Sequence, residues 1–225
     1  MTTATIAHTD EQIQREVLAE LEWDATVRST KIGVAVKDGV VILTGWVDSY
    51  AKKVAAERAT HRVRGVRAVV NDIEVHLPSS AERPDVDIAL EASRALAWDA
   101  LVPADRIQVT VSRGVITLEG EVSWEFEKRA AEAAVRRLAG IQGVINNVKV
   151  RPPVGPSPEQ LTQQIRDALV RNAETDAERI RVQVQDDKVI LRGTVRSWAE
   201  RAEAERVAWS APSVTEVENH ITVAP

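Results

Sequence analysis

Cysteine is absent from the 225 residues of this chain. This excludes a disulfide framework and thiolate metal sites, and it fits a reducing compartment. A signal peptide is also lacking, because no basic segment precedes an apolar one and a small-residue cleavage site. No run of about 18 apolar residues occurs. We therefore expect a soluble, cytoplasmic protein that would meet a membrane only peripherally, at its inner face.

Other absences argue against particular classes of function. With a formal net charge of -5 and a pI near 5.5, the chain lacks the broad basic field of a general nucleic-acid binder. A KH-type RNA-binding module is also disfavoured, because no G-x-x-G loop separates two predicted helices. No calcium loop and no Ser/His/Asp set at one module edge is found. Metal-ligand spacing is missing among the histidines, which are His8, His61, His76 and His220. We expect no catalytic residue, metal site or cofactor, and hence not an enzyme.

The sequence does contain an internal repeat. The segments GVVILTGWV, RGVITLEGEV and DKVILRGTV place Gly45, Gly120 and Gly193 at intervals of 75 and 73 residues. The same intervals align the flanking residues without a gap. We therefore expect an N-terminal tail, residues 1–9, and three copies of one module, at residues 10–77, 85–151 and 157–224. Proline-containing linkers are expected to hold the modules apart.

Each copy predicts the same elements in its first half. Apolar residues at i, i+4 and i+8 predict a helix with one buried face. They are Ile13, Val17 and Leu21, then Ile88, Ala92 and Leu96, then Leu161, Ile165 and Leu169. An alternating stretch after each helix predicts a half-buried strand. Asp38-Gly39 and Arg113-Gly114 tolerate positive φ and predict a hairpin to the next strand, and the third copy has Asp186-Asp187 there.

The second half of each copy predicts a helix and a final strand. Small residues dominate the predicted buried face of that helix, which should let it lie close to the sheet. The aligned sets are Ala51/Phe126/Ala199, Ala56/Ala131/Ala204, Ala59/Ala134/Val207 and Val63/Leu138/Ala211. The predicted fold class is α+β: three tandem α-β-β-α-β modules, each a three-stranded mixed sheet with two helices on one face.

The central strand of each copy resembles the G-V-V-x-L-x-G-x-V motif of the BON domain, a module of bacterial osmotically inducible and nodulation-associated proteins. Residues 39–47 and 114–122 fit this motif closely, and residues 187–195 fit it less well. The resemblance covers nearly the whole chain. It implies a stress-related, non-enzymatic protein whose modules bind phospholipid.

Aromatic and basic residues gather near the start of each second helix, where they could hold a lipid headgroup. They are Tyr50, Lys52, Lys53, Trp124, Lys128, Arg129, Trp198 and Arg201. The alternative is that these cations belong to a solvated, ion-paired helix face, because Lys53/Glu57, Lys128/Glu132 and Arg201/Glu205 recur at i, i+4.

Other recurring residues predict structural or interface roles. Trp46 on the central strand should face solvent and is a candidate interface residue. Trp23 and Trp98, after the first helices, are expected to cover the core. A structural role is expected for Gly39, Gly45, Gly114, Gly120, Gly193, Asn71, Asn146 and Asn219.

Three functions remain open. The first is peripheral binding of anionic phospholipid membranes through the basic and aromatic module edges. The second is a self-assembling or partner-binding scaffold, because exposed strand edges invite pairing and related modules build rings in secretion machinery. The third is small-ion sensing, since a potassium-binding relative also carries this module.

Overall fold

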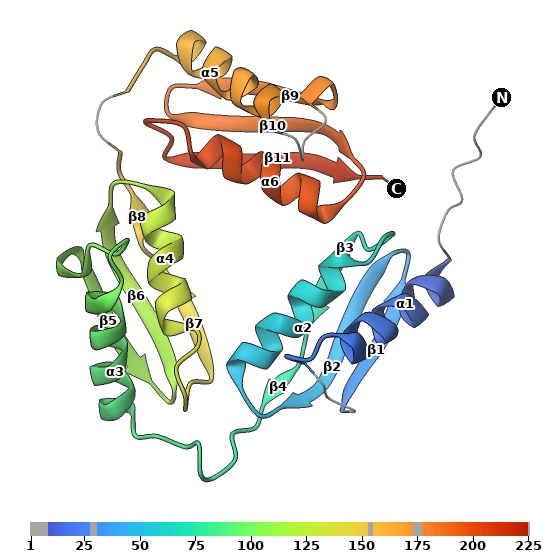
Figure 1. Cartoon of the computed structure of the whole chain (residues 1–225), viewed down its shortest axis with the longest axis vertical. Helices are drawn as coiled ribbons and strands as arrows, with labels where there is room; N and C mark the ends of the chain where they lie inside the picture. Colours follow the sequence, from blue (N-terminus) through green and yellow to red (C-terminus); the bar gives the residue numbers. More distant parts are fainter. Residues whose placement is uncertain (1–8, 28–30, 153–154, 173–176, 225) are drawn as a thin grey trace.

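A computed structural model describes residues 9–27, 31–152, 155–172 and 177–224, and shows three modules of one topology (Figure 1). The expected tail lies outside these residues apart from Thr9, as does His8. Module 1 comprises α1 (Asp10–Trp23), β1 (Ile32–Lys37), β2 (Val40–Val47), α2 (Tyr50–Arg62), β3 (Ala68–Asn71) and β4 (Glu74–Val75). Module 2 comprises α3 (Asp85–Trp98), η1 (Ala104–Arg106), β5 (Ile107–Ser112), β6 (Val115–Val122), α4 (Glu125–Val135), β7 (Gly143–Asn146) and β8 (Lys149–Val150). Module 3 comprises α5 (Pro158–Arg171), η2 (Ala177–Arg179), β9 (Ile180–Gln185), β10 (Lys188–Val195), α6 (Trp198–Trp209) and β11 (Glu216–Val223).

Each sheet is mixed, with the motif strand in the middle. In module 1, β2 pairs antiparallel with β1 and parallel with β3 and β4. The last strand is interrupted in modules 1 and 2, whereas β11 of module 3 runs unbroken. Both helices of a module cover the same face of its sheet (Figure 1). The predicted class, α+β with three α-β-β-α-β modules, is confirmed.

Each module has its own hydrophobic core between the helices and the sheet. All nine apolar residues predicted for the first helices are at most 5% exposed. Ala56, Ala131 and Ala204 of the second helices are fully buried, as expected. The first set, Ala51, Phe126 and Ala199, is exposed, so that part of the prediction is wrong. The reason is that five residues along a helix turn the side chain about 140° away from the face of Ala56.

The hairpins form as the turn residues predict. Asp38 and Gly39 have φ of 52° and 76°, and Arg113 and Gly114 have 50° and 74°. Asp186 supplies the positive φ in module 3, at 54°. Sequence reasoning missed a carboxylate that holds the first two turns: the backbone N–H groups of Asp38 and Gly39 donate to Asp10 at 2.8 and 2.9 Å. Asp85 accepts the equivalent pair in module 2.

Candidate functional site

The aromatic residues at the second helices lie between modules. The modules are therefore in contact. The prediction that their linkers hold them apart is wrong. Trp198 of module 3 packs against the core of module 1, and Tyr50 of module 1 packs against the core of module 2. We call these two contacts the 1–3 seam and the 1–2 seam.

The 1–3 seam is centred on the indole of Trp198. Its Nε1–H donates to the backbone carbonyl of Val66. The ring of His61, on α2, lies against it with centroids 4.7 Å apart. His61 Nδ1 is buried and has no hydrogen-bond partner in the part of the chain that the structure describes. An apolar contact, one hydrogen bond and an unsatisfied nitrogen therefore meet at this seam.

The 1–2 seam uses the phenol of Tyr50, which is half-buried. Burial raises the pKa of Tyr50, a hydrogen bond with the Val144 backbone opposes this, and the nearby Glu132 carboxylate adds to the rise. Both neighbours belong to module 2.

Trp124 lies in neither seam. It lines a cavity of about 610 Å³ between modules 2 and 3, which is also lined by Leu101, Phe126 and Trp209.

The candidate headgroup cations have different partners. Lys52 pairs with Asp48 at 2.7 Å, and Arg129 pairs with Glu125 at 3.2 Å. Arg201 donates to the backbone carbonyls of Asn219 and Ile221, at 2.9 and 3.1 Å, and its guanidinium lies 5.1 Å from the Trp198 ring centroid. Lys53 and Lys128 are partly exposed. The structure thus places Arg201 in a structural bond network and keeps the lysines toward solvent.

The strand asparagines make one bonding pattern three times. Asn146 Nδ2 donates to the Lys128 carbonyl at 3.0 Å and to Glu132 Oε2 at 3.2 Å. Its Oδ1 accepts from the Val148 N–H at 3.3 Å. Asn71 and Asn219 repeat these bonds in their own modules. The amide therefore ties the last strand to the second helix, and the glutamate expected to pair with a cation accepts it instead.

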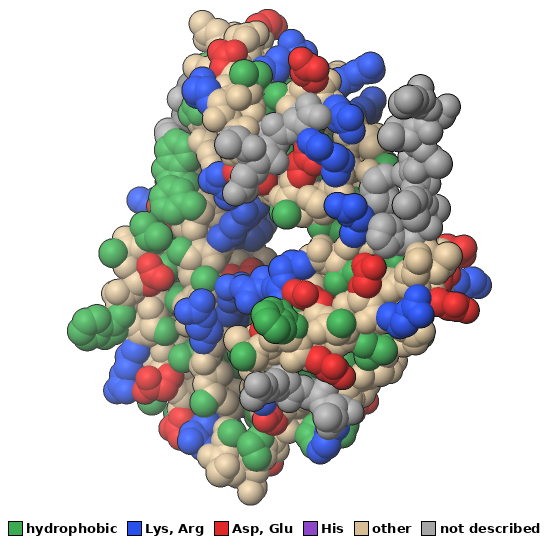
Figure 2. All heavy atoms as spheres, turned by 45° about the vertical axis from the view of Figure 1, so that its right-hand side comes forward, with side chains coloured by type: hydrophobic (Ala, Val, Ile, Leu, Met, Phe, Trp, Pro, Cys, Tyr) green, Lys and Arg blue, Asp and Glu red, His purple; other side chains and the backbone are tan. Residues whose placement is uncertain are grey.

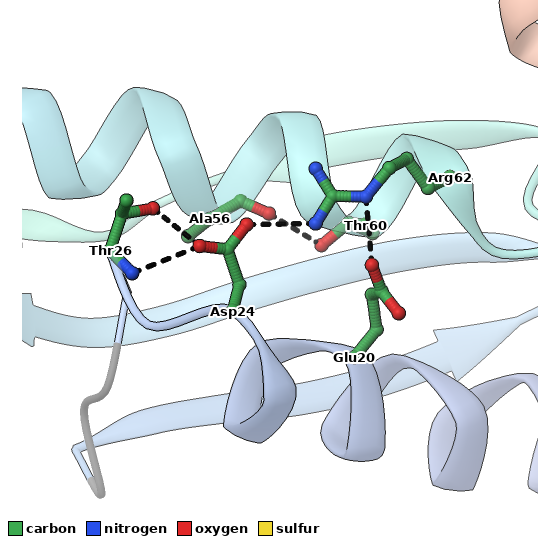
Figure 3. Close-up of polar contacts among 6 residues, drawn as sticks. All are labelled: Glu20, Asp24, Thr26, Ala56, Thr60 and Arg62. Atoms are coloured by element: carbon green, nitrogen blue, oxygen red, sulfur yellow. Dashed lines mark hydrogen bonds and ion pairs between the residues drawn. The ribbon is translucent and has the colours of Figure 1, made fainter.

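An ion-pair cluster joins the ends of the two helices of module 1 (Figure 3). Arg62, at the end of α2, donates to Glu20 at 2.7 Å and to Asp24 at 2.8 Å. The side-chain bond from Thr26, followed by that from Arg62, lowers the pKa of Asp24 to about 2. The charge of Arg62 is thus satisfied within module 1.

Trp46 lies on the sheet face that carries no helix, and it is 36% exposed. The ammonium of Lys31 lies 3.5 Å from its ring centroid, and the imidazole of His76 stacks on it at 5.4 Å. The three side chains form a mixed aromatic and cationic surface.

Trp23 and Trp98 do not cover the core, so this expectation was wrong. They are 85% and 88% exposed at the ends of α1 and α3. Val86, Leu90 and Leu101 of module 2 are exposed as well, at 70%, 53% and 59%. A sequence signal existed: Val86 and Leu90 are spaced i, i+4 on the side of α3 opposite the core residues.

We predict that the stability of the folded protein depends on pH through His61 at the 1–3 seam. Burial lowers the pKa of His61 below its usual 6.5, Arg201 lowers it further, and Glu57 raises it. Between the lowered pKa and 6.5 the unfolded chain binds more protons, so stability rises with pH and is lost as pH falls through this window. We expect unfolding midpoints of the wild type to fall on acidification across it.

The His61→Phe variant keeps a ring against Trp198 and should lose this dependence. His220→Gln, which alters an exposed histidine, should retain it. An unchanged pH profile in His61→Phe would contradict the assignment.

Within the described residues, no helix is both long and apolar enough to cross a bilayer. No group of three or more histidine, aspartate or glutamate side chains in that part of the chain is placed to hold a metal ion.

Comparison with known proteins places all three modules in one family. The family model described as "BON domain" matches residues 9–76, 84–152 and 157–225. Osmotically-inducible protein Y of Escherichia coli (strain K12) is 27% identical over 146 residues, which cover 63% of this chain and 73% of that protein. An uncharacterized protein in the gshII 5'region of Anaplasma centrale is 29% identical over 125 residues, covering 54% and 83%.

Solved structures of CdsD, a structural protein of the type III secretion system of Chlamydia trachomatis, also match. Two of them have a TM-score of 0.27 and identities of 11% and 12%, and each match covers 94% of this chain. The matches cover 96% and 91% of the CdsD chains. A TM-score this low supports no argument about this chain from the CdsD structures.

Proposed function

The chain belongs to the BON domain family, and from this membership we propose that it is a stress-related, non-enzymatic protein that binds anionic phospholipid membranes at their surface. Its relative in Escherichia coli is named as osmotically inducible, which supports osmotic stress as the setting. Three modules in one chain would make three weak contacts at once, and so gain avidity.

The exposed tryptophans are the observation that carries this proposal. Trp23 and Trp98 project into solvent at the ends of α1 and α3, which are equivalent helices of the repeat. An exposed indole is favoured at a membrane–water interface, where its ring is buried and its N–H stays hydrated. We call Val86, Leu90 and Trp98 the α3 apolar stripe; with Trp23 it offers apolar area that a folded monomer ordinarily buries.

Cations supply the selectivity for anionic lipid in this proposal. Lys52, Lys53, Lys128 and Arg129 are at least partly exposed on α2 and α4. Each basic residue near an anionic surface contributes about 1 kcal/mol. The formal net charge of -5 opposes approach, so binding depends on these local groups and on salt.

Co-sedimentation with vesicles tests the proposal. Wild type should pellet with phosphatidylglycerol vesicles far more than with phosphatidylcholine vesicles. Binding should fall steeply from about 0.1 M to about 1 M salt, over which the screening length drops from about 10 Å to about 3 Å. Replacing Trp23 and Trp98 by serine, or Lys52, Lys53, Lys128 and Arg129 by glutamine, should weaken binding about tenfold or more, about 1.4 kcal/mol.

Two controls make this test specific. Arg181→Gln changes an exposed cation on β9 of module 3, which carries none of the tryptophans, lysines or arginines replaced in this test, and should leave binding nearly unchanged. Circular dichroism of each variant checks that the fold is intact. Equal pelleting of wild type and both multiple variants would refute the proposal.

The second candidate function, a self-assembling scaffold, is favoured by the open sheet face of module 1. Ala35, Ile42 and Val70 form one cross-strand row on that face. Val70 is 42% exposed, and Trp46 lies on the same face. Light scattering coupled to size exclusion distinguishes the candidates, because a scaffold should form oligomers that Trp46→Ser disrupts.

A further inference from the structure

A cavity of about 580 Å³ lies in the 1–3 seam, beside the contact between Trp198 and His61. Module 1 contributes the end of α2 and the segment after it, with His61, Arg62 and Arg64 on the wall. Module 3 contributes Arg196 and the start of α6. The cavity therefore exists only while modules 1 and 3 are in contact.

The wall of the cavity is basic. Three arginines contribute to it: Arg62, which also pairs with Glu20 and Asp24, Arg64 and Arg196. Arg64 is exposed on the wall and Arg196 faces it from the other module. The wall also carries the carboxylate of Glu200, which is buried and accepts the Arg196 backbone N–H at 2.9 Å. Lysine and arginine side chains also gather around the opening near the middle of the molecule in Figure 2.

Two further groups suit a ligand that accepts hydrogen bonds. His61 Nδ1 is buried at this seam and has no hydrogen-bond partner among the described residues, whereas most buried polar atoms of proteins have a protein or water partner. Helix α6 begins at the cavity, and the first N–H groups of a helix have no acceptor within it. The helix cap takes one of these groups, through the bond from the Glu200 N–H to Ser197 Oγ.

We propose that this seam cavity binds an oxyanion, a phosphate group carried by a small molecule or by a lipid, through Arg64 and Arg196. Guanidinium groups bind phosphate oxygens in a two-pronged geometry, which favours arginine over lysine at such a site. Because the two arginines come from different modules, the bound anion ties module 1 to module 3. The proposal is independent of membrane binding through the tryptophans and lysines.

Calorimetric titration with inorganic phosphate tests the site in the full-length protein, with chloride at matched ionic strength as the reference. Wild type should bind phosphate, whereas Arg64→Gln and Arg196→Gln should each weaken binding about tenfold, about 1.4 kcal/mol. Arg58→Gln is the matched control, because Arg58 is an exposed arginine of the same helix as Arg62 and does not line the cavity. The His61 imidazole resonances should shift during the titration in wild type and in Arg58→Gln.

Two arms separate the sources of phosphate. Glycerol phosphate represents a free headgroup, and phosphatidic acid vesicles represent a lipid. Binding to either probe that depends on Arg64 and Arg196, but not on Arg58, supports the site and names its source. The site is refuted if no phosphate probe binds, or if the Arg64 and Arg196 variants bind as wild type does.

The phosphate titration is repeated with the variant in which Lys52, Lys53, Lys128 and Arg129 are glutamine. Retained phosphate binding supports a site independent of the membrane surface. Loss of phosphate binding there, in a folded variant, would overturn the placement of the site.

Discussion

Gly120→Ala is expected to remove most of the stability of module 2. Gly120 has φ of 142°, and an added Cβ would lie 2.0 Å from the backbone carbonyl oxygen of Arg106. The added Cβ and the carbonyl oxygen are both fixed to the backbone and are not the flexible end of a side chain, so the sheet edge itself must shift. The unfavourable φ alone costs about 1–3 kcal/mol, and the displaced backbone adds to it. Since small domains are stable by only about 5–15 kcal/mol, we expect a large drop in the unfolding midpoint.

The control is Gly143→Ala, on the neighbouring strand β7. An added Cβ there would first meet Val115 Cγ1 at 3.8 Å, an ordinary contact. The variant should be as stable as wild type or slightly more stable, because alanine restricts the unfolded chain. Urea unfolding followed by circular dichroism compares the two. Equal midpoints for the Gly120 and Gly143 variants would contradict the close approach at Gly120.

Trp198→Ala is expected to open the 1–3 seam while all three modules stay folded. The change removes the hydrogen bond to the Val66 carbonyl and the contact with His61. A fully buried tryptophan replaced by alanine costs about 3–5 kcal/mol, and this half-buried one should cost about 2 kcal/mol. That loss falls on the contact between modules, because the indole packs against a core of another module.

Small-angle scattering should therefore show a larger radius of gyration, and limited proteolysis should cut faster between modules 2 and 3. The matched control is Trp98→Ala, which removes an indole that is 88% exposed and should change neither measurement. A compact, protease-resistant Trp198→Ala protein would show that the seam does not depend on this residue.

Much of the fold could be predicted because local pattern and burial agree. Ile13, Val17 and Leu21 lie on one helix face, and only the core could cover them. The hairpins followed from residues that tolerate positive φ. The exposed position of Phe126 could have been foreseen as well, since helical geometry turns it away from Ala131.

The candidate site was less predictable, because identical residue types have opposite surroundings. Trp98 and Trp198 have the same chemistry, yet one is in solvent and the other lies between modules. No local pattern distinguishes them, since the neighbour of Trp198 is Val66, 132 residues earlier in the chain. Asp10 was missed for a related reason, because its partners are turn amides that any sequence carries.

The amino-acid sequence by itself determined the repeated module, its order of helices and strands, and the residues of each core, because these depend on periodicities of two and 3.6 residues within short segments. Only the tertiary structure decided which aromatic rings meet another module and which arginines face one cavity. Those contacts depend on the relative placement of three folded units, and that placement is set by surfaces composed of residues distant in the chain.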